Sequence, residues 1–175
     1  MTDPKFLVEK QLWDATKPMC HLVQAGDFIW LSGVVAFDEN GAVVGAGDIK
    51  AQARQIFTNV RRRLGMVGCD LNSIIRLTNY LTTPMEDMTF TRQYWEVRDE
   101  FFGSHRPAST GVQVVALMLP ELVLEVDVVA YAPGALHRSG AALNVELMLA
   151  AGIGAFFQCS SSLAGAIWVW REISN

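Results

Sequence analysis

The sequence contains few of the residues that build metal sites or disulfide frameworks. Among its 175 residues are three cysteines and three histidines. They are scattered and form no CxxC or HxxxH pair: Cys20, Cys69, Cys159, His21, His105 and His137. Zinc sites and disulfide frameworks need closely spaced ligands or paired cysteines. We therefore expect no metal site, no cofactor and a reducing compartment, the cytoplasm.

Basic charge is also scarce. The formal net charge is -4 and the sequence pI is about 5.3, whereas nucleic-acid-binding domains usually present a basic face. The run Arg61-Arg62-Arg63 falls near the C-terminal end of a predicted helix, where the helix dipole favours positive charge. We expect a solvated helix face there, and no nucleic-acid partner.

Uninterrupted apolar runs are missing as well. The chain begins Met1-Thr2-Asp3-Pro4-Lys5, without the apolar stretch that follows the start of a signal peptide. Polar side chains interrupt residues 138–171 before any apolar stretch reaches the length that spans a bilayer. We expect no membrane partner, a single domain over residues 1–133, and a C-terminal extension of unknown role over residues 134–175.

What the sequence does contain is a regular succession of strand and helix patterns. Asp38-Glu39-Asn40-Gly41 predicts a turn that pairs Val43-Val44 back onto a preceding strand. Apolar periodicity predicts strands over 28–35, 74–82, 109–116 and 122–131, and helices over 49–66 (capped by Asp48) and 88–102. This order predicts an α+β domain with two helices on one face of a mixed sheet.

Alternation along the strands assigns their two faces, because apolar residues belong under the helices. The residues expected to face the helices are Ile75, Leu77, Asn79, Leu81, Thr110, Val112, Val114, Leu124, Val126 and Val128. Those expected on the opposite face are Ser109, Gly111, Gln113, Glu125 and Asp127. A half-polar second face predicts that water or another subunit covers it.

Several fragments are similar, in order, to segments of the Rid (reactive intermediate deaminase, YjgF/L-PSP) family. They are Ser32-Gly33, the run Gly47 to Gln55 with Asn59-Val60, Phe101-Phe102 before Arg106-Pro107-Ala108, Leu119-Pro120, and Leu124 to Ala130. Together they fall within residues 18–133. The resemblance implies a chorismate-mutase-like fold, homotrimers whose sheets form an inner barrel, and sites in clefts between subunits.

The resemblance also implies an activity and a set of site residues. Family members hydrolyse reactive enamines and imines to ketones and ammonia. Ser32 and Glu125 match family site residues, and the family's carboxylate at position 125 holds the attacking water. Other positions differ: Met19, Trp95, Ser109 and Gly111 stand where the family usually has tyrosine, asparagine, a carboxylate-binding arginine, and a small or Cys residue. We interpret the chain as a branch that lacks this arginine.

Glu125 is the catalytic candidate, because imine hydrolysis needs one group that takes a proton from water and delivers it to the departing amine. Its structural alternative is an inter-subunit hydrogen bond or salt bridge. Arg106 is the candidate substitute for the missing arginine, although its place before Pro107 allows it to point outward. Trp95 either stacks on a conjugated substrate or fills the core or an interface. The substrate-binding candidates are Ser32, Trp95, Arg106, Ser109 and Gly111.

Two classes of function stay open at this point. The first is a hydrolytic deaminase of reactive enamines or imines, for which an aminomuconate-like conjugated compound is a candidate substrate. The second is a non-catalytic, small-molecule-binding or regulatory homotrimer on the same scaffold. Endoribonuclease activity, also described in the family, is disfavoured by the acidic charge balance.

Overall fold

The computed structural model describes residues 3–83, 86 and 88–134. Their elements are β1 (Lys5–Leu7), β2 (Leu22–Ala25), β3 (Phe28–Val34), α1 (Ile49–Gly65), the 3₁₀ turn η1 (Leu71–Ser73), β4 (Ile74–Leu81), α2 (Met88–Phe102), β5 (Ala108–Gln113) and β6 (Leu124–Tyr131). No helix in this part of the chain is long and apolar enough to cross a bilayer. The predicted extension from residue 135 onward lies outside the described residues.

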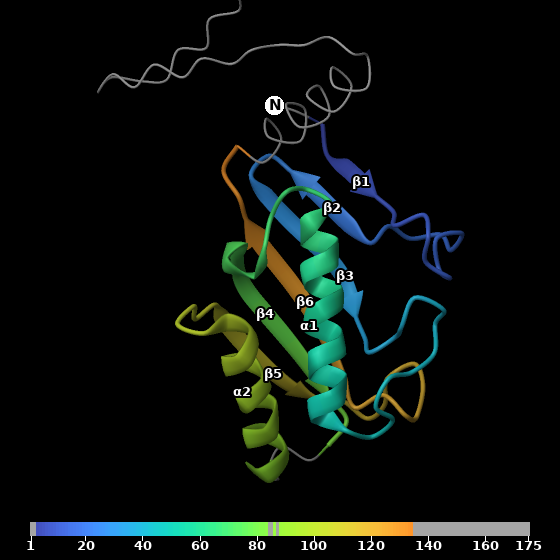
Figure 1. The fold of residues 1–175 in the computed structure, drawn as a ribbon, viewed down its shortest axis with the longest axis vertical. Coiled ribbons are helices and arrows are strands. Elements are labelled where there is room, and N and C mark those ends of the chain that lie inside the picture. Colours follow the sequence, from blue (N-terminus) through green and yellow to red (C-terminus); the bar gives the residue numbers. More distant parts are fainter. Residues whose placement is uncertain (1–2, 84–85, 87, 135–175) are drawn as a thin grey trace, which may run out of the picture. The chain divides into compact units, whose positions relative to one another are not determined.

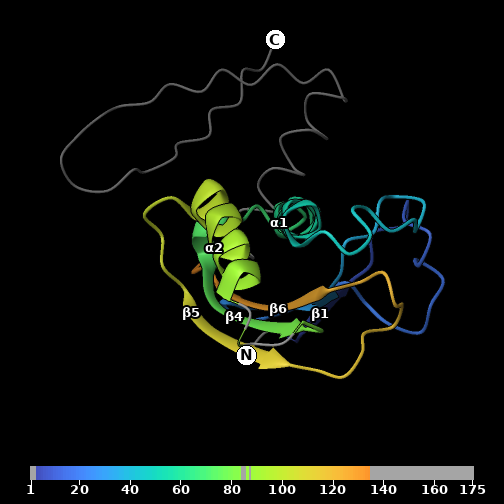
Figure 2. The same ribbon diagram turned by 90° about the horizontal axis from the view of Figure 1, so that it is seen from below.

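The strands form one mixed sheet in the order β1-β2-β3-β6-β4-β5. β4 and β5 are parallel, joined through α2, and every other pair is antiparallel. Figures 1 and 2 show α1 and α2 side by side on one face of this sheet. An ion pair between Arg54 and Glu100, 2.7 Å, joins the two helices. The predicted α+β class, with two helices on one face, is confirmed.

The first helix forms where its capping residue and apolar stripe predict it. The Asp48 carboxylate accepts hydrogen bonds from the amides of Lys50 and Ala51, which satisfies two otherwise free donors at the helix start. The six residues of the predicted apolar stripe are all buried: Ile49, Ala53, Ile56, Phe57, Val60 and Leu64. The stripe packs on the sheet, and Phe57 meets the rings of Tyr94 and Phe102 from α2.

A buried glutamine on α1 fixes the loop that leads into β6. The Gln52 side-chain amide donates to the carbonyls of Gly45 (3.0 Å) and Glu121 (2.7 Å), and its carbonyl accepts from the Val123 amide (2.9 Å). Gln52 is fully buried, and its bond to the Val123 amide satisfies a buried backbone donor. Because Val123 directly precedes β6, Gln52 holds the start of the strand that carries Glu125.

The N-terminal strands differ from the sequence prediction. β1 and β2 were not predicted, because both are short and the first is mostly exposed. The expected strand at Val43-Val44 reduces to one isolated bridge between Phe37 and Val43, although the predicted turn is present and Asp38 accepts from the amides of Asn40 and Ala42. The predicted turn is therefore confirmed, whereas the predicted strand pairing at Val43-Val44 is wrong in length.

The face assignment was wrong at Ile75 and along the whole of β5, where Thr110, Val112 and Val114 face away from the helices. Ile75 is 42% exposed while Ile74 is buried, because an irregularity in the β4–β6 register between Ile74 and Arg76 shifts the alternation by one residue. Ser109 lies on the helix-facing side of β5, where it contacts Asn79 and Arg98. Gly111 and Gln113 share that side by alternation. Every residue of β5 is exposed, so apolarity does not distinguish the two sides of this edge strand.

The Gln52 anchor generates a stability prediction. Gln52→Met keeps the side-chain volume but leaves the buried Val123 amide without a partner, whereas the Gly45 and Glu121 carbonyls still accept from the amides of Asp48 and Gly47. We therefore expect a loss of about 1 to 3 kcal/mol in the free energy of unfolding. Urea unfolding followed by circular dichroism measures it. The exposed Gln11→Met provides the matched control. Equal stability of the two variants would show that Gln52 is not an anchor.

Candidate functional site

An acidic pair lies on the sheet face opposite the helices. Glu125 and Asp127 are two residues apart on β6, so both side chains point to the same face. Tyr80 of β4 lies opposite Glu125 in the register, and its hydroxyl donates to Asp127 Oδ2 over 2.9 Å. Glu125 forms no hydrogen bond or ion pair with any residue that the structure describes. One acid is thus engaged within the chain, and the other is available.

The surroundings of Glu125 favour its protonated form. Burial and, to a smaller extent, the neighbouring Asp127 charge raise the pKa of Glu125 above its ordinary value. A carboxyl group with a raised pKa releases and takes up protons closer to neutral pH, which is what a proton carrier needs. The predicted placement of Glu125 on the face away from the helices is confirmed.

Gly33 makes room for this carboxylate. A Cβ atom built on residue 33 would lie 2.0 Å from Glu125 Oε1 and 3.4 Å from Asp127 Oδ1. The β3–β6 register shifts between Leu31 and Val34, so Gly33 sits at a bulge that brings its Cα directly against Glu125. A side chain at residue 33 would therefore displace the Glu125 carboxylate, which explains the glycine of the Ser32-Gly33 pair.

A second group of predicted residues meets between α2 and β5. Trp95, Ser109 and Gly111 line a cavity of about 260 Å³ there. Asn79 of β4 forms its floor: Asn79 donates to Ser109 Oγ over 3.0 Å and accepts from the Tyr94 hydroxyl over 2.5 Å. This network fixes the position of the Ser109 hydroxyl, while Trp95 remains 51% exposed at the rim.

Arg98 brings a cation to this cavity that the sequence reasoning missed. Its Nη1 donates to Ser109 Oγ over 2.8 Å, and its guanidinium lies over the rings of Tyr94 (5.9 Å) and Phe102 (5.8 Å). No carboxylate among the described residues lies within ion-pair distance of it. Trp95 and Arg98 are three residues apart, so both side chains lie on the same face of α2. This spacing is the sequence signal that could have linked Arg98 to the predicted Trp95.

Arg106, the predicted substitute for the missing arginine, is engaged elsewhere. It donates to the carbonyls of Gly103 and His105 and pairs with Asp99 at 3.4 Å. It nevertheless lines an open hollow of about 470 Å³ together with Trp95, Arg98 and Ser109. Arg98 contacts the Ser109 hydroxyl directly, and Arg106 does not.

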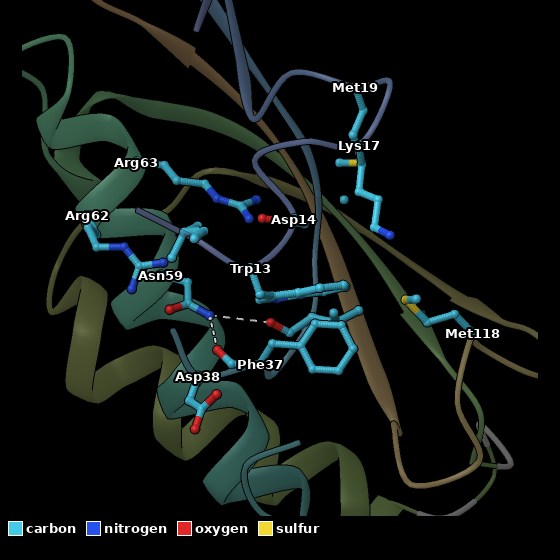
Figure 3. Close-up of a pocket in the computed structure, with 13 residues that line it drawn as sticks. Trp13, Asp14, Lys17, Met19, Phe37, Asp38, Asn59, Arg62, Arg63 and Met118 are labelled. Atoms are coloured by element: carbon cyan, nitrogen blue, oxygen red, sulfur yellow. Dashed lines mark hydrogen bonds between the residues drawn. The ribbon is translucent and has the colours of Figure 1, made fainter. Parts of the chain in front are cut away.

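Ser32 and Met19 belong to the N-terminal side of the molecule. The Ser32 hydroxyl donates to the carbonyl of Cys20 over 2.6 Å and so fixes the end of the N-terminal segment. Met19 and Gly33 line a further cavity of about 370 Å³, shown in Figure 3. Within the described residues no group of three or more His, Cys, Asp or Glu side chains is arranged to hold a metal ion.

One chain does not bring all the predicted site residues together. Glu125 points away from the helices, whereas Trp95, Ser109 and Gly111 lie on the helix side of the neighbouring strand pair. The body of the sheet separates the two groups. The geometry defines two partial sites, one that supplies a carboxylate and one that supplies a cation and an aromatic ring.

These features define a small α+β domain with a half-buried acid of raised pKa on the sheet face away from its helices. The family model described as Endoribonuclease L-PSP matches residues 9–132, which is more than half of the chain. The protein therefore belongs to this family, to which the YjgF and Rid proteins belong, and the resemblance seen in the sequence fragments is confirmed. That the chain represents a branch lacking the arginine stays a prediction.

Two relatives carry activities in their names. The 3-aminoacrylate deaminase RutC of Acinetobacter baylyi is 28% identical over 118 residues, covering 65% of this chain and 86% of that protein. The mouse 2-iminobutanoate/2-iminopropanoate deaminase is 28% identical over 103 residues, covering 59% and 73%. The solved structure of a YjgF/YER057c/UK114 family member from Mycobacterium tuberculosis has a TM-score of 0.61 at 25% identity, covering 74% of this chain and 100% of that one.

The acidic pair generates a prediction about proton affinity. Asp127→Asn removes a negative charge beside Glu125, so the pKa of Glu125 should fall while burial keeps it above the ordinary value. A carboxyl-carbon NMR titration of the variant and the wild type measures this. A Glu125 pKa that stays the same or rises would mean that the two acids do not sense each other.

Proposed function

We propose that the protein is a hydrolytic deaminase of reactive enamines or imines, acting as a homotrimer. In this arrangement Glu125 of one copy works beside the Arg98 cavity of a neighbouring copy. The observation that carries the proposal is Glu125 itself: a half-buried carboxylate with a raised pKa and no partner among the described residues of its own chain. A purely structural carboxylate is normally paired, because burying an unpaired charge costs free energy.

The exposed sheet face supports the assembly. Phe28, Trp30 and Tyr131 are each about two-fifths exposed on this face, and the Phe28 ring lies 5.2 Å from that of Tyr131 and 5.9 Å from that of Trp30. An aromatic cluster beside acids on an otherwise uncovered sheet is typical of a surface that another subunit covers. A second copy seated there would also explain how two partial sites on opposite sides of one chain come to meet.

The reaction needs few groups. A water molecule attacks the carbon of the C=N bond and loses a proton to the Glu125 carboxylate. Glu125 delivers that proton to the nitrogen, which gives a carbinolamine. Glu125 then takes the proton of the carbinolamine hydroxyl and passes it to the amine as the C–N bond breaks, so the products are a carbonyl compound and ammonia. An enamine first gains a proton at carbon and loses one from nitrogen to become the imine. One acid with a raised pKa serves every transfer, and no electrons are exchanged.

Arg98 is the residue that we assign to an anionic group of the substrate. A guanidinium offers several donors in a fixed plane, and Arg98 spends one on Ser109 while stacking holds the plane in place. Trp95 stands at the same rim, where its ring is free to cover a conjugated substrate such as an aminomuconate-like compound. The two deaminase relatives are both 28% identical to this chain but are named for different substrates, so their names do not decide the substrate here.

Glu125→Gln tests the proposal. The amide keeps the size of the side chain but carries no transferable proton, so ammonia release from freshly generated enamines and imines should fall by about 10²- to 10⁴-fold. Sedimentation should show a three-chain particle for the variant and the wild type, with similar melting temperatures. Full activity in an assembled variant would remove the catalytic role and favour the non-catalytic binding protein. A monomer would remove the shared site.

Arg98→Met tests the anion-binding role. Losing a charge-assisted contact of about 1.5 to 3 kcal/mol should lower kcat/KM roughly ten- to a hundredfold on carboxylate-bearing substrates. The exposed Arg92→Met, on the same helix, provides the matched control. A larger loss in Arg106→Met than in Arg98→Met would return the role to Arg106.

A further inference from the structure

The hollow in front of Glu125 contains a third titratable side chain, Tyr80, to which the proposed reaction gives no task. Tyr80 belongs to β4, which lies beside β6 in the sheet (Figure 1). The hollow measures about 270 Å³ and is lined by Tyr80, Glu125, Asp127 and three apolar residues after β5: Val114, Ala116 and Leu117. No lysine or arginine of the described residues lines it. The groups that titrate against Glu125 there are therefore Asp127 and Tyr80.

The pairing of β4 with β6 fixes where the Tyr80 side chain lies. In this antiparallel register Tyr80 is opposite Glu125, and Thr78 is opposite Asp127. Directly opposite side chains share one face, and an aromatic side chain also reaches its diagonal neighbour. The Tyr80 hydroxyl accordingly donates to Asp127 Oδ2 over 2.9 Å. The Thr78 hydroxyl is nearer along the strands but forms no hydrogen bond with the described residues, so Tyr80 is the donor that holds Asp127.

This hydrogen bond determines which way the Asp127 carboxylate faces. Its Oδ2 is held by Tyr80, and its Oδ1 approaches the same point beside Gly33 as Glu125 Oε1. A Cβ built on Gly33 would lie 3.4 Å from Asp127 Oδ1 and 2.0 Å from Glu125 Oε1. Asp127 is partly exposed, and water solvates a charge better than the protein does. Without Tyr80 the Asp127 carboxylate would therefore turn toward water and away from Glu125.

The proton affinities of the neighbouring groups agree with this arrangement. The hydrogen bond to Asp127 and the Asp127 charge raise the pKa of Tyr80, so Tyr80 keeps its proton and remains a donor at neutral pH. Burial, and after it the Asp127 charge, raises the pKa of Glu125. The interaction between two charges weakens with distance. The effect of Asp127 on Glu125 is therefore largest while Tyr80 holds the two carboxylates together.

We propose that Tyr80 is a positioning residue, whose hydroxyl holds the Asp127 carboxylate against Glu125 and so keeps Glu125 ready to deliver a proton. This inference rests on the proposed role of Glu125 as proton carrier. A tyrosine suits the task because its hydroxyl is a neutral donor on a rigid ring. A lysine or arginine would also hold Asp127, but its positive charge would favour the ionised form of Glu125 and oppose the effect of Asp127.

A carboxyl-carbon NMR titration of the full chain tests this role without relying on activity. Tyr80→Phe keeps the ring but lacks the hydroxyl, so Asp127 should turn away and the pKa of Glu125 should fall. The fall should not exceed that in Asp127→Asn, which removes the charge itself. The lost O–H dipole acts in the opposite sense, but the field of a dipole decays faster with distance than that of the displaced full charge. Thr78→Val, the matched control, removes the unbonded hydroxyl opposite Asp127 and should leave the pKa of Glu125 unchanged.

The double variant of Tyr80→Phe and Asp127→Asn shows whether Tyr80 acts through Asp127. Once the Asp127 charge is gone, its position no longer matters, so the pKa of Glu125 should equal that in Asp127→Asn alone. A further change in the double variant would mean that Tyr80 acts on Glu125 directly, and would overturn the proposal. So would a Glu125 pKa that does not fall in Tyr80→Phe, or that falls equally in Thr78→Val.

The pH profile of ammonia release gives a second readout. Ionised Glu125 accepts the proton of water, so kcat/KM should rise with pH through the pKa of Glu125, and Tyr80→Phe should move this rise to lower pH. A purely structural role of Tyr80 would lower the rate at every pH and leave the rise in place, which would overturn the proposal. Absence of ammonia release in the wild type would refute the deaminase alone, because the NMR titration still measures whether Tyr80 positions Asp127.

Discussion

The close approach of Glu125 to Gly33 is the contact on which the candidate site depends. A carboxylate can occupy that place only because residue 33 has no side chain and because a bulge in β3 turns its Cα toward β6. The same contact partly buries the acid, and burial is the main cause of its raised pKa. Gln52 acts further away to the same end, since it fixes the backbone just before β6. The bulge at Gly33 and the buried Gln52 side chain therefore determine where the Glu125 carboxylate lies and how strongly it holds a proton.

The two faces of the sheet carry different functional groups. The outer side carries Glu125 and, further along β6 and β3, exposed aromatic rings, and the helix side carries the Asn79, Ser109 and Arg98 network. A rigid sheet keeps these groups apart in one chain, so a shared site requires a second copy. This gives the exposed aromatic face and the exposed edge strand β5 one common explanation. The net charge of -4 gives no comparable support to nucleic-acid binding, although the family model is described as an endoribonuclease.

The helices, the strands and the orientation of their side chains were predictable wherever one face of the element is buried. The two helices and the alternation along β6, including the orientation of Glu125, followed from apolar periodicity alone. The face of Ser109 did not, because β5 is exposed on both sides and carries no apolar signal. Arg98 was also missed: its spacing from Trp95 places the two on one helix face, but its contact with Ser109 across the β4–α2–β5 unit cannot be read from the sequence. The cavity under the N-terminal segment depends on two strands too short to be recognised from sequence.

In the proposed assembly each site combines Glu125 of one copy with Arg98 of another, and mixed trimers test this arrangement. Glu125→Gln, expected to lose about 10²- to 10⁴-fold in activity, and Arg98→Met, expected to lose about ten- to a hundredfold, are unfolded and refolded together in equal amounts. Random assembly gives about a quarter of the interfaces both intact residues, so ammonia release should recover to roughly a quarter of the wild-type rate. Activity no higher than the sum of the separate preparations would place both residues in the same site of one chain and contradict the account.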